Sequence, residues 1–229
     1  EVRGQGQIPQ PWVNFDALPV ELRGPLSVHG FTTPTTIQAH AVSVLAAGRD
    51  LLGVAQTGSG KTLAYLVPCL AGLLKSPGEV RLGLAWSPPI LILAPTRELV
   101  CQIAAEADRF RHSADIAAVA VYGGASRALQ LAALRGRPQV VAATPGRLVD
   151  FLLADQACLS VRDVRFLVLD EADRMLDDGF EPQIRRIAAE ASLGNRQTAM
   201  LSATWPAVVQ TLAADFLRDP VEIHVGGFS

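Results

Sequence analysis

Two clusters of residues in this 229-residue chain have the types and spacing needed to bind a nucleotide phosphate and its metal ion. The first is Ala55-Gln-Thr-Gly-Ser-Gly-Lys-Thr62, which lies between a short apolar run and a longer apolar stretch. Gly58 and Gly60 let the chain curl, so that successive backbone N–H groups point inward at phosphate oxygens. Lys61 can then reach the β- and γ-phosphates, and the Thr62 hydroxyl can bind Mg²⁺. The alternative interpretation is a glycine-rich turn between a strand and a helix.

The second cluster is Phe166-Leu-Val-Leu-Asp-Glu-Ala-Asp173, in which four apolar residues end in two adjacent carboxylates. Mg²⁺ on a nucleotide needs a hard oxygen ligand, which Asp170 could supply directly or through water. Glu171 could orient or deprotonate an attacking water. Taken alone, such a pair is more often a helix N-cap or a solvated turn. Asp173 projects differently and could tie this turn to another element.

The elements that must position these clusters alternate between short apolar runs and longer Ala/Leu-rich stretches. Strands are predicted at Leu51–Ala55, Ile90–Ala94, Ile116–Val121, Gln139–Ala142, Phe166–Leu169, Ala199–Leu201 and Val221–Val225. Helices are predicted near Lys61–Leu74, Glu98–Phe110, Ser126–Leu134, Gly146–Leu153, Glu181–Ala191 and Ala207–Phe216. This order predicts an α/β domain with a mainly parallel central sheet of about seven strands and helices on both faces. Ligands of such sheets bind beyond the carboxyl ends of the strands, where both clusters fall.

Composition excludes several classes of protein. Hydrophobic residues make up 49% and charged residues 18%, which excludes a disordered chain. No apolar run reaches the roughly 18 residues that a membrane span needs. Cys69, Cys101 and Cys158 are far apart, which disfavours a disulfide framework or zinc site and favours a reducing, intracellular compartment. The net charge is −2, so any nucleic-acid site must be a local patch. The Gly- and Pro-rich stretch Ser76–Pro89 is predicted to be a surface loop.

Seven short elements stand in the order found in DEAD-box ATP-dependent RNA helicases, and from about Phe15 onward the chain resembles the N-terminal RecA-like domain of that family. The elements are Gly30-Phe-Thr-Thr-Pro-Thr-Thr-Ile-Gln38 (Q motif), Ala55–Thr62 (motif I), Pro95-Thr-Arg-Glu-Leu99 (motif Ia), Gly123-Gly124 (the GG element), Thr144-Pro-Gly-Arg147 (motif Ib), Asp170-Glu-Ala-Asp173 (motif II) and Ser202-Ala-Thr204 (motif III). The resemblance implies an N-terminal extension at 1–14, a RecA-like P-loop NTPase domain at 15–225 and the start of an interdomain linker at 226–229.

The resemblance also implies ATP and Mg²⁺ as cofactors. The ATP-binding residues would be Phe31, Gln38, Thr57, Gly58, Ser59, Gly60, Lys61 and Thr62; the magnesium ligands Thr62 and Asp170; and the catalytic residues Lys61, Asp170 and Glu171. The Gln38 amide can pair with N6 and N7 of adenine, and the Phe31 ring can pack against the base. Without the other motifs, Phe31 would be interpreted as a core residue and Gln38 as a surface residue.

The implied RNA contacts are to the sugar-phosphate backbone, with low sequence selectivity. The residues are Pro95, Thr96, Arg97, Gly123, Gly124, Thr144, Pro145, Gly146 and Arg147. Ser202 and Thr204 are expected to face Asp173 and to couple the nucleotide site to domain movement. The family places their strand between the P-loop strand and the strand that carries Asp170. An N-cap before Trp205-Pro206 is the alternative role for Thr204.

The function hypothesis is the ATP-binding half of an ATP-dependent RNA helicase, which couples ATP binding and hydrolysis to RNA binding and local duplex unwinding. Its partners would be RNA and a second RecA-like domain, which is absent from this chain. No H-R-x-G-R-like string occurs here, and arginine fingers contribute about 10³–10⁵ in rate, so the isolated domain is expected to be nearly inactive. The alternatives are a nucleotide-dependent RNA clamp or scaffold and a DNA-directed helicase or translocase of the same fold. An intracellular location is expected, with nucleus and cytoplasm both open.

Overall fold

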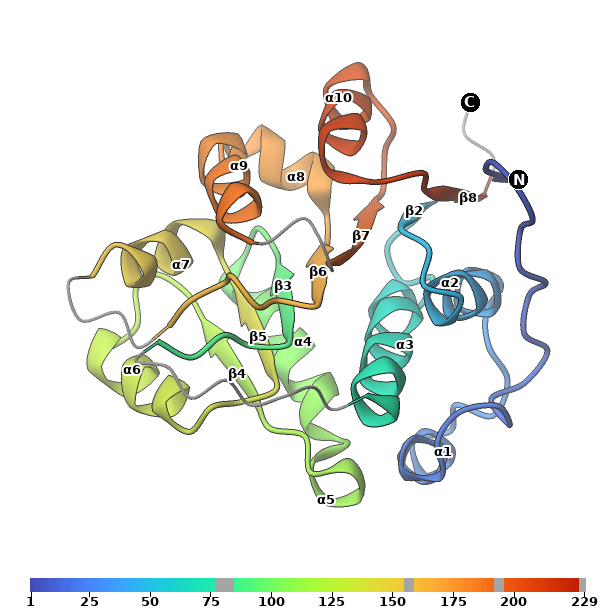
Figure 1. Ribbon diagram of the computed structural model, residues 1–229, viewed down its shortest axis with the longest axis horizontal. Coiled ribbons are helices and arrows are strands. Elements are labelled where there is room, and N and C mark those ends of the chain that lie inside the picture. Colours follow the sequence, from blue (N-terminus) through green and yellow to red (C-terminus); the bar gives the residue numbers. More distant parts are fainter. Residues whose placement is uncertain (77–84, 155–158, 192–195, 227–229) are drawn as a thin grey trace.

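A computed structural model describes residues 1–76, 85–154, 159–191 and 196–226 (Figure 1). Its centre is one eight-stranded sheet with the order β1-β8-β2-β7-β6-β3-β5-β4. The strands are β1 (Val2–Arg3), β2 (Leu51–Ala55), β3 (Ile90–Leu93), β4 (Ala118–Val121), β5 (Val140–Ala143), β6 (Phe166–Leu169), β7 (Gln197–Ser202) and β8 (Val221–Val225). Every neighbouring pair is parallel except β1 with β8. The predicted α/β fold with a mainly parallel sheet is confirmed, and β1 adds a short edge strand that the sequence did not indicate.

Helices cover both faces of the sheet (Figure 1). They are α1 (Val20–Val28), α2 (Thr36–Ala46), α3 (Lys61–Lys75), α4 (Arg97–Asp108), α5 (Arg111–Ala114), α6 (Arg127–Arg135), α7 (Pro145–Leu152), α8 (Ala172–Asp177), α9 (Glu181–Glu190) and α10 (Ala207–Phe216). Within the described ranges, no helix has both the length and the apolar character that a membrane crossing requires.

The sheet separates two apolar cores, because successive side chains of a strand point to opposite faces. In β3, Ile90 and Ile92 pack with α2, α3 and α4, whereas Leu91 and Leu93 pack on the other side with α7, α9 and α10. All four β3 side chains are fully buried, as the apolar run predicted.

The parallel pairing brings the carboxyl ends of β2, β7, β6, β3, β5 and β4 to one edge of the sheet. β7 lies between β2 and β6, so the motif III strand separates the two strands that carry the phosphate-binding and acidic clusters. The loops that leave this edge hold the sequence-predicted site residues.

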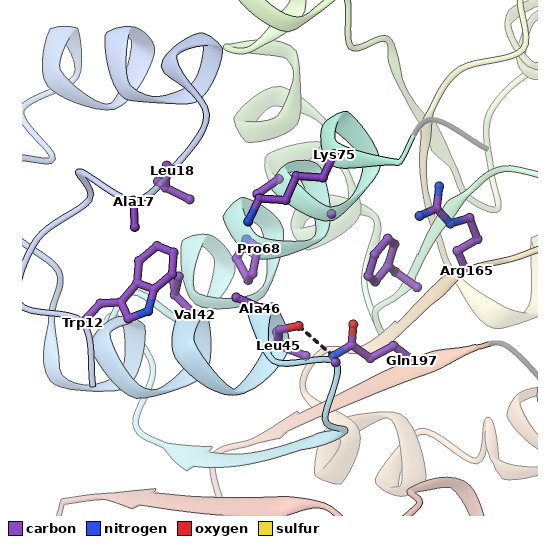
Figure 2. A pocket seen from close by; sticks show the side chains of 14 residues that line it. Trp12, Ala17, Leu18, Val42, Leu45, Ala46, Pro68, Lys75, Arg165 and Gln197 are labelled. Atoms are coloured by element: carbon purple, nitrogen blue, oxygen red, sulfur yellow. Dashed lines mark hydrogen bonds between the residues drawn. The ribbon is translucent and has the colours of Figure 1, made fainter. Parts of the chain in front are cut away.

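A separate pocket of about 200 Å³ opens near the opposite ends of β6 and β7, beside their first residues Phe166 and Gln197 (Figure 2). Trp12 lies across it from Lys75, and the Trp12 backbone N–H donates to the Ala39 carbonyl at 2.9 Å. The Gln197 side-chain amide donates to the Leu45 carbonyl in α2 and to the Arg49 carbonyl in the turn after that helix. The bond to Ala39 and the pairing of β1 with β8 therefore pack the N-terminal residues on the domain.

Three features from the sequence fall partly or wholly outside the described residues. The predicted Ser76–Pro89 loop is described only at residue 76 and from 85 onward, and of the expected linker at 226–229 only Gly226 is described. Cys69 is a buried free thiol and Cys101 an exposed one, while Cys158 lies outside the described residues.

Candidate functional site

The loop after β2 has the backbone shape that phosphate binding requires. Gly58 has φ +79° and Gly60 has φ +92°, in the left-handed region that glycine adopts without a steric cost. Gly60 is the N-cap of α3, and no side chain caps the first turn of that helix. Its N–H groups are therefore available to an anion. The Lys61 ammonium is buried and donates to the Ala55 carbonyl at 2.7 Å, which holds it inside the loop.

The acidic cluster lies at the end of β6. Asp170 is buried, with Oδ2 accepting from the Tyr65 hydroxyl at 2.8 Å and Oδ1 accepting from the Glu171 backbone at 3.0 Å. Burial raises the pKa of Asp170 to about 6, and the Glu171 charge adds to the rise, whereas the Tyr65 hydrogen bond and the Lys61 charge oppose it. Glu171 has φ +53°, a strained conformation for a residue with a side chain. Its carboxylate lies 3.7 Å from Arg174.

Both clusters line a single cleft of about 600 Å³. The sequence-predicted residues that line it are Phe31, Gln38, Thr57, Gly58, Gly60, Lys61, Thr62, Asp170 and Glu171. Ser59 does not line it: its hydroxyl is buried without a hydrogen-bond partner among the described residues. Lys61 and the two carboxylates thus face the same space, as one nucleotide with its cation would require.

The Q-motif residues are hydrogen-bonded to the phosphate-binding loop. Gln38 is buried; its Nε2 donates to the Gly60 carbonyl at 3.2 Å and its Oε1 accepts from the Thr35 backbone at 2.9 Å. The Thr35 hydroxyl donates to the Ser59 carbonyl at 3.0 Å. An amide has two N–H donors and two acceptor lone pairs, so each end of Gln38 keeps capacity for a second bond. Adenine recognition by this amide is compatible with its structural bonds.

The oxygen donors in the cleft suit Mg²⁺. In the described part of the chain, no group of three or more His, Cys, Asp or Glu side chains could hold a metal ion by itself. Mg²⁺ is usually held by one or two carboxylates together with substrate phosphates and water. The Thr62 hydroxyl and the Asp170 carboxylate, which share the cleft with the phosphate-binding loop, fit that pattern.

Motif III is linked directly to motif II. The Thr204 backbone N–H and hydroxyl both donate to Asp173 Oδ2, at 2.9 and 2.7 Å. Burial acts to raise the pKa of Asp173, but these hydrogen bonds and one from the Arg174 backbone outweigh it, so the pKa is lowered. The Ser202 hydroxyl is fully buried and close enough to contribute to this lowering, although it makes no hydrogen bond of normal geometry. The N-cap of α10 is Pro206, so Thr204 does not cap that helix.

The residues predicted to contact RNA follow β3, β4 and β5, which are neighbours in the sheet. The structure brings these loops to the same edge as the nucleotide cleft, one to three strands beyond β6 in the sheet. After β3, Pro95 is buried, Thr96 caps α4 by accepting from the Leu99 N–H, and Arg97 is exposed beside the Tyr122 ring.

After β4 and β5 the backbone itself is presented. Gly124 has φ +81°, and an added Cβ at Gly123 or Gly124 would meet no atom within 4 Å, so this turn is open. Pro145 begins α7 and is buried, followed by Gly146, while the N-cap Thr144 makes no side-chain capping bond. Arg147 donates to the Ala125 carbonyl at 3.2 Å, which joins the two loops.

Sequence reasoning assigned no cleft role to five residues that face the cleft or its acidic end. Leu63 lines the cleft from α3, Leu99, Gln102 and Glu106 line it from α4, and Tyr65 bonds Asp170 from α3. The α4 residues recur at intervals of three and four, which is the signature of one helix face. Tyr65 follows Lys61 by four residues in an otherwise apolar helix, and a buried phenol needs a hydrogen-bond partner.

The parallel sheet, the glycine-rich loop before α3 and the acidic strand end define a P-loop nucleotide-binding domain. A profile of the DEAD/DEAH box helicase family matches residues 35–212. The chain is 46% identical over 223 residues to DEAD-box ATP-dependent RNA helicase 14 of Arabidopsis thaliana, which covers 96% of this chain and 35% of that protein. It is also 45% identical over 221 residues to ATP-dependent RNA helicase DBP2 of Saccharomyces cerevisiae, a match that covers 96% of this chain and 39% of that protein. The chain belongs to the DEAD/DEAH box helicase family.

Solved structures agree with this assignment. The yeast DEAD-box splicing factor Prp28 superposes with a TM-score of 0.87 and 35% identity, over 100% of this chain and 55% of that one. Prp28 from Chaetomium thermophilum bound to ADP gives a TM-score of 0.85 and 38% identity, over 99% of this chain and 54% of the Prp28 chain. The chain therefore spans roughly a third of the curated relatives and about half of the solved chains.

Proposed function

We propose that this chain is the ATP- and magnesium-binding half of an ATP-dependent RNA helicase. The observation that carries the proposal is the single cleft shared by Lys61, Thr62, Asp170 and Glu171. The loops predicted to contact RNA leave the same sheet edge on neighbouring strands, and the relatives that match nearly all of this chain are named ATP-dependent RNA helicases.

Each side chain of the cleft has a defined role in this proposal. Phe31 and Gln38 bind adenine, and the N–H groups from residue 57 to the start of α3 hold the phosphates. Lys61 exchanges the Ala55 carbonyl for a phosphate oxygen. Thr62 and Asp170 hold Mg²⁺, which supplies charge neutralisation to the triphosphate when bound.

Hydrolysis is assigned to a water that Glu171 orients. The water oxygen bonds to the γ-phosphorus, the bond from that phosphorus to the bridging oxygen breaks, and the water proton passes to the Glu171 carboxylate. The products are ADP and phosphate. The Asp173–Thr204 contact then relays the state of the cleft to motif III.

RNA is proposed to bind across the loops after β3, β4 and β5 through its sugar-phosphate backbone. A second RecA-like domain would complete both sites, with residues 15–225 as the first domain, 1–14 as an extension and 226–229 as the start of the linker. Since ATP and RNA are intracellular, the protein is assigned to an intracellular compartment.

The test is Glu171→Gln in the longer protein that includes the second domain. ATP binding should survive because the amide keeps the shape of the carboxylate, whereas turnover should fall by about 10²–10⁴ because the base is lost. Glu190→Gln is the matched control, since Glu190 lies at the end of α9 in a surface ion pair with Arg186. Retained turnover in Glu171→Gln would reject this role.

RNA and DNA oligonucleotides of the same sequence decide the substrate class in the same assay. RNA is expected to stimulate turnover and DNA is not. Equal stimulation by both would favour a nucleic-acid translocase without RNA selectivity. Binding of both ligands without turnover in the unmodified protein would favour a clamp.

A further inference from the structure

A fully buried tyrosine lies directly behind the proposed magnesium ligands. Tyr65 is in α3, three residues after Thr62 and four after Lys61, so the helical repeat places it on their face of the helix. Its hydroxyl donates to Asp170 Oδ2 at 2.8 Å. The two residues are 105 positions apart in the chain, and this bond joins the helix that follows the phosphate-binding loop to the acidic strand end.

The phenol fixes the orientation of the Asp170 carboxylate. Oδ1 accepts from the Glu171 backbone at 3.0 Å and Oδ2 accepts from Tyr65, so both oxygens are held. The carboxylate can therefore present only its remaining lone pairs to the cleft, and rotation about its terminal bond would break at least one of these hydrogen bonds.

Thr62, the second proposed ligand, lies near the phenol, one helical turn before Tyr65. Burial and the Asp170 charge raise the pKa of Tyr65 well above its usual value, whereas the nearby Thr62 hydroxyl acts to lower it. The geometry of the bond to Asp170 Oδ2 makes the phenol its donor.

We propose that Tyr65 is a positioning residue for the magnesium site, in which its hydroxyl sets the orientation of the Asp170 carboxylate beside Thr62. The inference rests on the proposed function of the cleft, because it assumes that these two side chains hold Mg²⁺. Groups that hydrogen-bond metal ligands typically change metal affinity by 10- to 100-fold when they are removed.

The test is Tyr65→Phe in this chain, with binding of a fluorescent ADP analogue followed as Mg²⁺ is titrated. We expect the Mg²⁺ concentration at half-maximal enhancement to rise at least about tenfold. Affinity in excess EDTA should be unchanged, because neither the base pocket nor the loop N–H groups involve the phenol. A purely structural role would instead weaken binding equally with and without Mg²⁺.

Thr198→Val is the matched control, since it removes a buried hydroxyl that accepts from Arg196 near the start of β7, away from the cleft. It should leave the Mg²⁺ titration unchanged. Circular dichroism verifies folding of both variants. Loss of the fold in Tyr65→Phe would overturn the proposal, because positioning requires a domain that folds without the hydroxyl.

A double-mutant cycle with Asp170→Asn tests whether Tyr65 acts through that carboxylate. The Tyr65→Phe effect on the Mg²⁺ titration should largely disappear in the Asp170→Asn background. An undiminished effect there, or an unchanged titration in Tyr65→Phe, overturns the role of Tyr65 alone. If the unmodified chain binds the analogue with no dependence on Mg²⁺, the magnesium assignment of the cleft itself is wrong.

Discussion

Gly60 lies where the phosphate-binding loop becomes α3, and its replacement by alanine would test whether the loop and the Q motif form one unit. The residue has φ +92°, and an added Cβ would lie 2.6 Å from Gln38 Nε2 and 3.3 Å from the Thr35 hydroxyl. Contacts under 3.0 Å do not persist, so the methyl group must displace the Gln38 amide. That amide is the group that we assign to adenine.

The expected cost follows from these contacts. A left-handed conformation costs an alanine about 1–2 kcal/mol. Displacing Gln38 removes its bonds to the Gly60 carbonyl and the Thr35 N–H, at about 1 kcal/mol each. Gly58→Ala is the matched control, because Gly58 has φ +79° but an added Cβ would meet no atom within 4 Å. The free energy of unfolding should therefore fall by about 1–2 kcal/mol more in Gly60→Ala than in Gly58→Ala.

Urea denaturation measures the difference in stability, and binding of fluorescent ATP and GTP analogues measures base selectivity. Gly58→Ala should weaken both nucleotides equally, since it disturbs only the phosphate end. Gly60→Ala should also lower the preference for ATP over GTP, and Gln38→Ala should do so without the backbone strain. Equal destabilisation by the two glycine variants, together with unchanged selectivity in Gly60→Ala, would refute the reasoning.

Two further predictions concern the carboxylates. The raised pKa of Asp170, about 6, means that magnesium-dependent nucleotide binding should decline as the pH falls from 7 to 5, in a fluorescence titration. Without metal, the contribution of Asp170 to the free energy of unfolding should instead fall as the pH rises from about 4 to 6, because the folded chain binds this proton more tightly than the unfolded chain. Asp170→Asn should remove this contribution and the pH dependence of magnesium binding that Asp170 causes. Thr204→Val removes the hydroxyl that donates to Asp173 and should lower the free energy of unfolding by about 1 kcal/mol at neutral pH. Because the pKa of Asp173 is lowered in the fold, this difference should shrink as acid protonates it, which circular dichroism during acid unfolding would measure; a constant difference down to low pH would contradict the assignment.

The architecture was predictable because the central strands are buried on both faces and so appear as continuous apolar runs. Their ends were less predictable: β7 extends from Gln197 to Ser202 rather than Ala199–Leu201, because pairing with β2 and β6 recruits polar residues at both ends. β1 is set by pairing with β8 alone, and no local pattern in two residues could indicate it.

Helices α1, α2, α5 and α8 were not predicted, for local reasons. α1 contains Gly24 and Pro25, which are poor helix formers, whereas α5 is only four residues long and α8 only six. The first turn of α2 contains Gln38, whose side chain is held by the Thr35 backbone and the phosphate-binding loop. Its apolar residues are buried on a helix that is largely enclosed, which weakens the amphipathic signal.

The site was predictable where residues follow strands or belong to a recognisable motif. Lys61 and Thr62 begin α3 after the loop that leaves β2, and Asp170 follows β6 directly, so the sheet topology determines their meeting. Glu106 and Tyr65 lie inside helices, and their places depend on how α4 and α3 rotate against the sheet. That rotation depends on packing among many side chains and is not evident from the local sequence pattern.

The strand order also connects the two proposed ligand sites through the backbone. β6, which ends in the acidic cluster, is the direct neighbour of β3, which leads into motif Ia, and the Asp170 N–H donates to the Leu93 carbonyl at 2.9 Å. On the other side, Asp173 holds Thr204 after β7. The acidic turn is thus bonded to an RNA-side strand and to motif III at once. A shift of this turn upon nucleotide binding would have to strain or move both neighbours, since close-packed elements transmit displacements rather than absorb them.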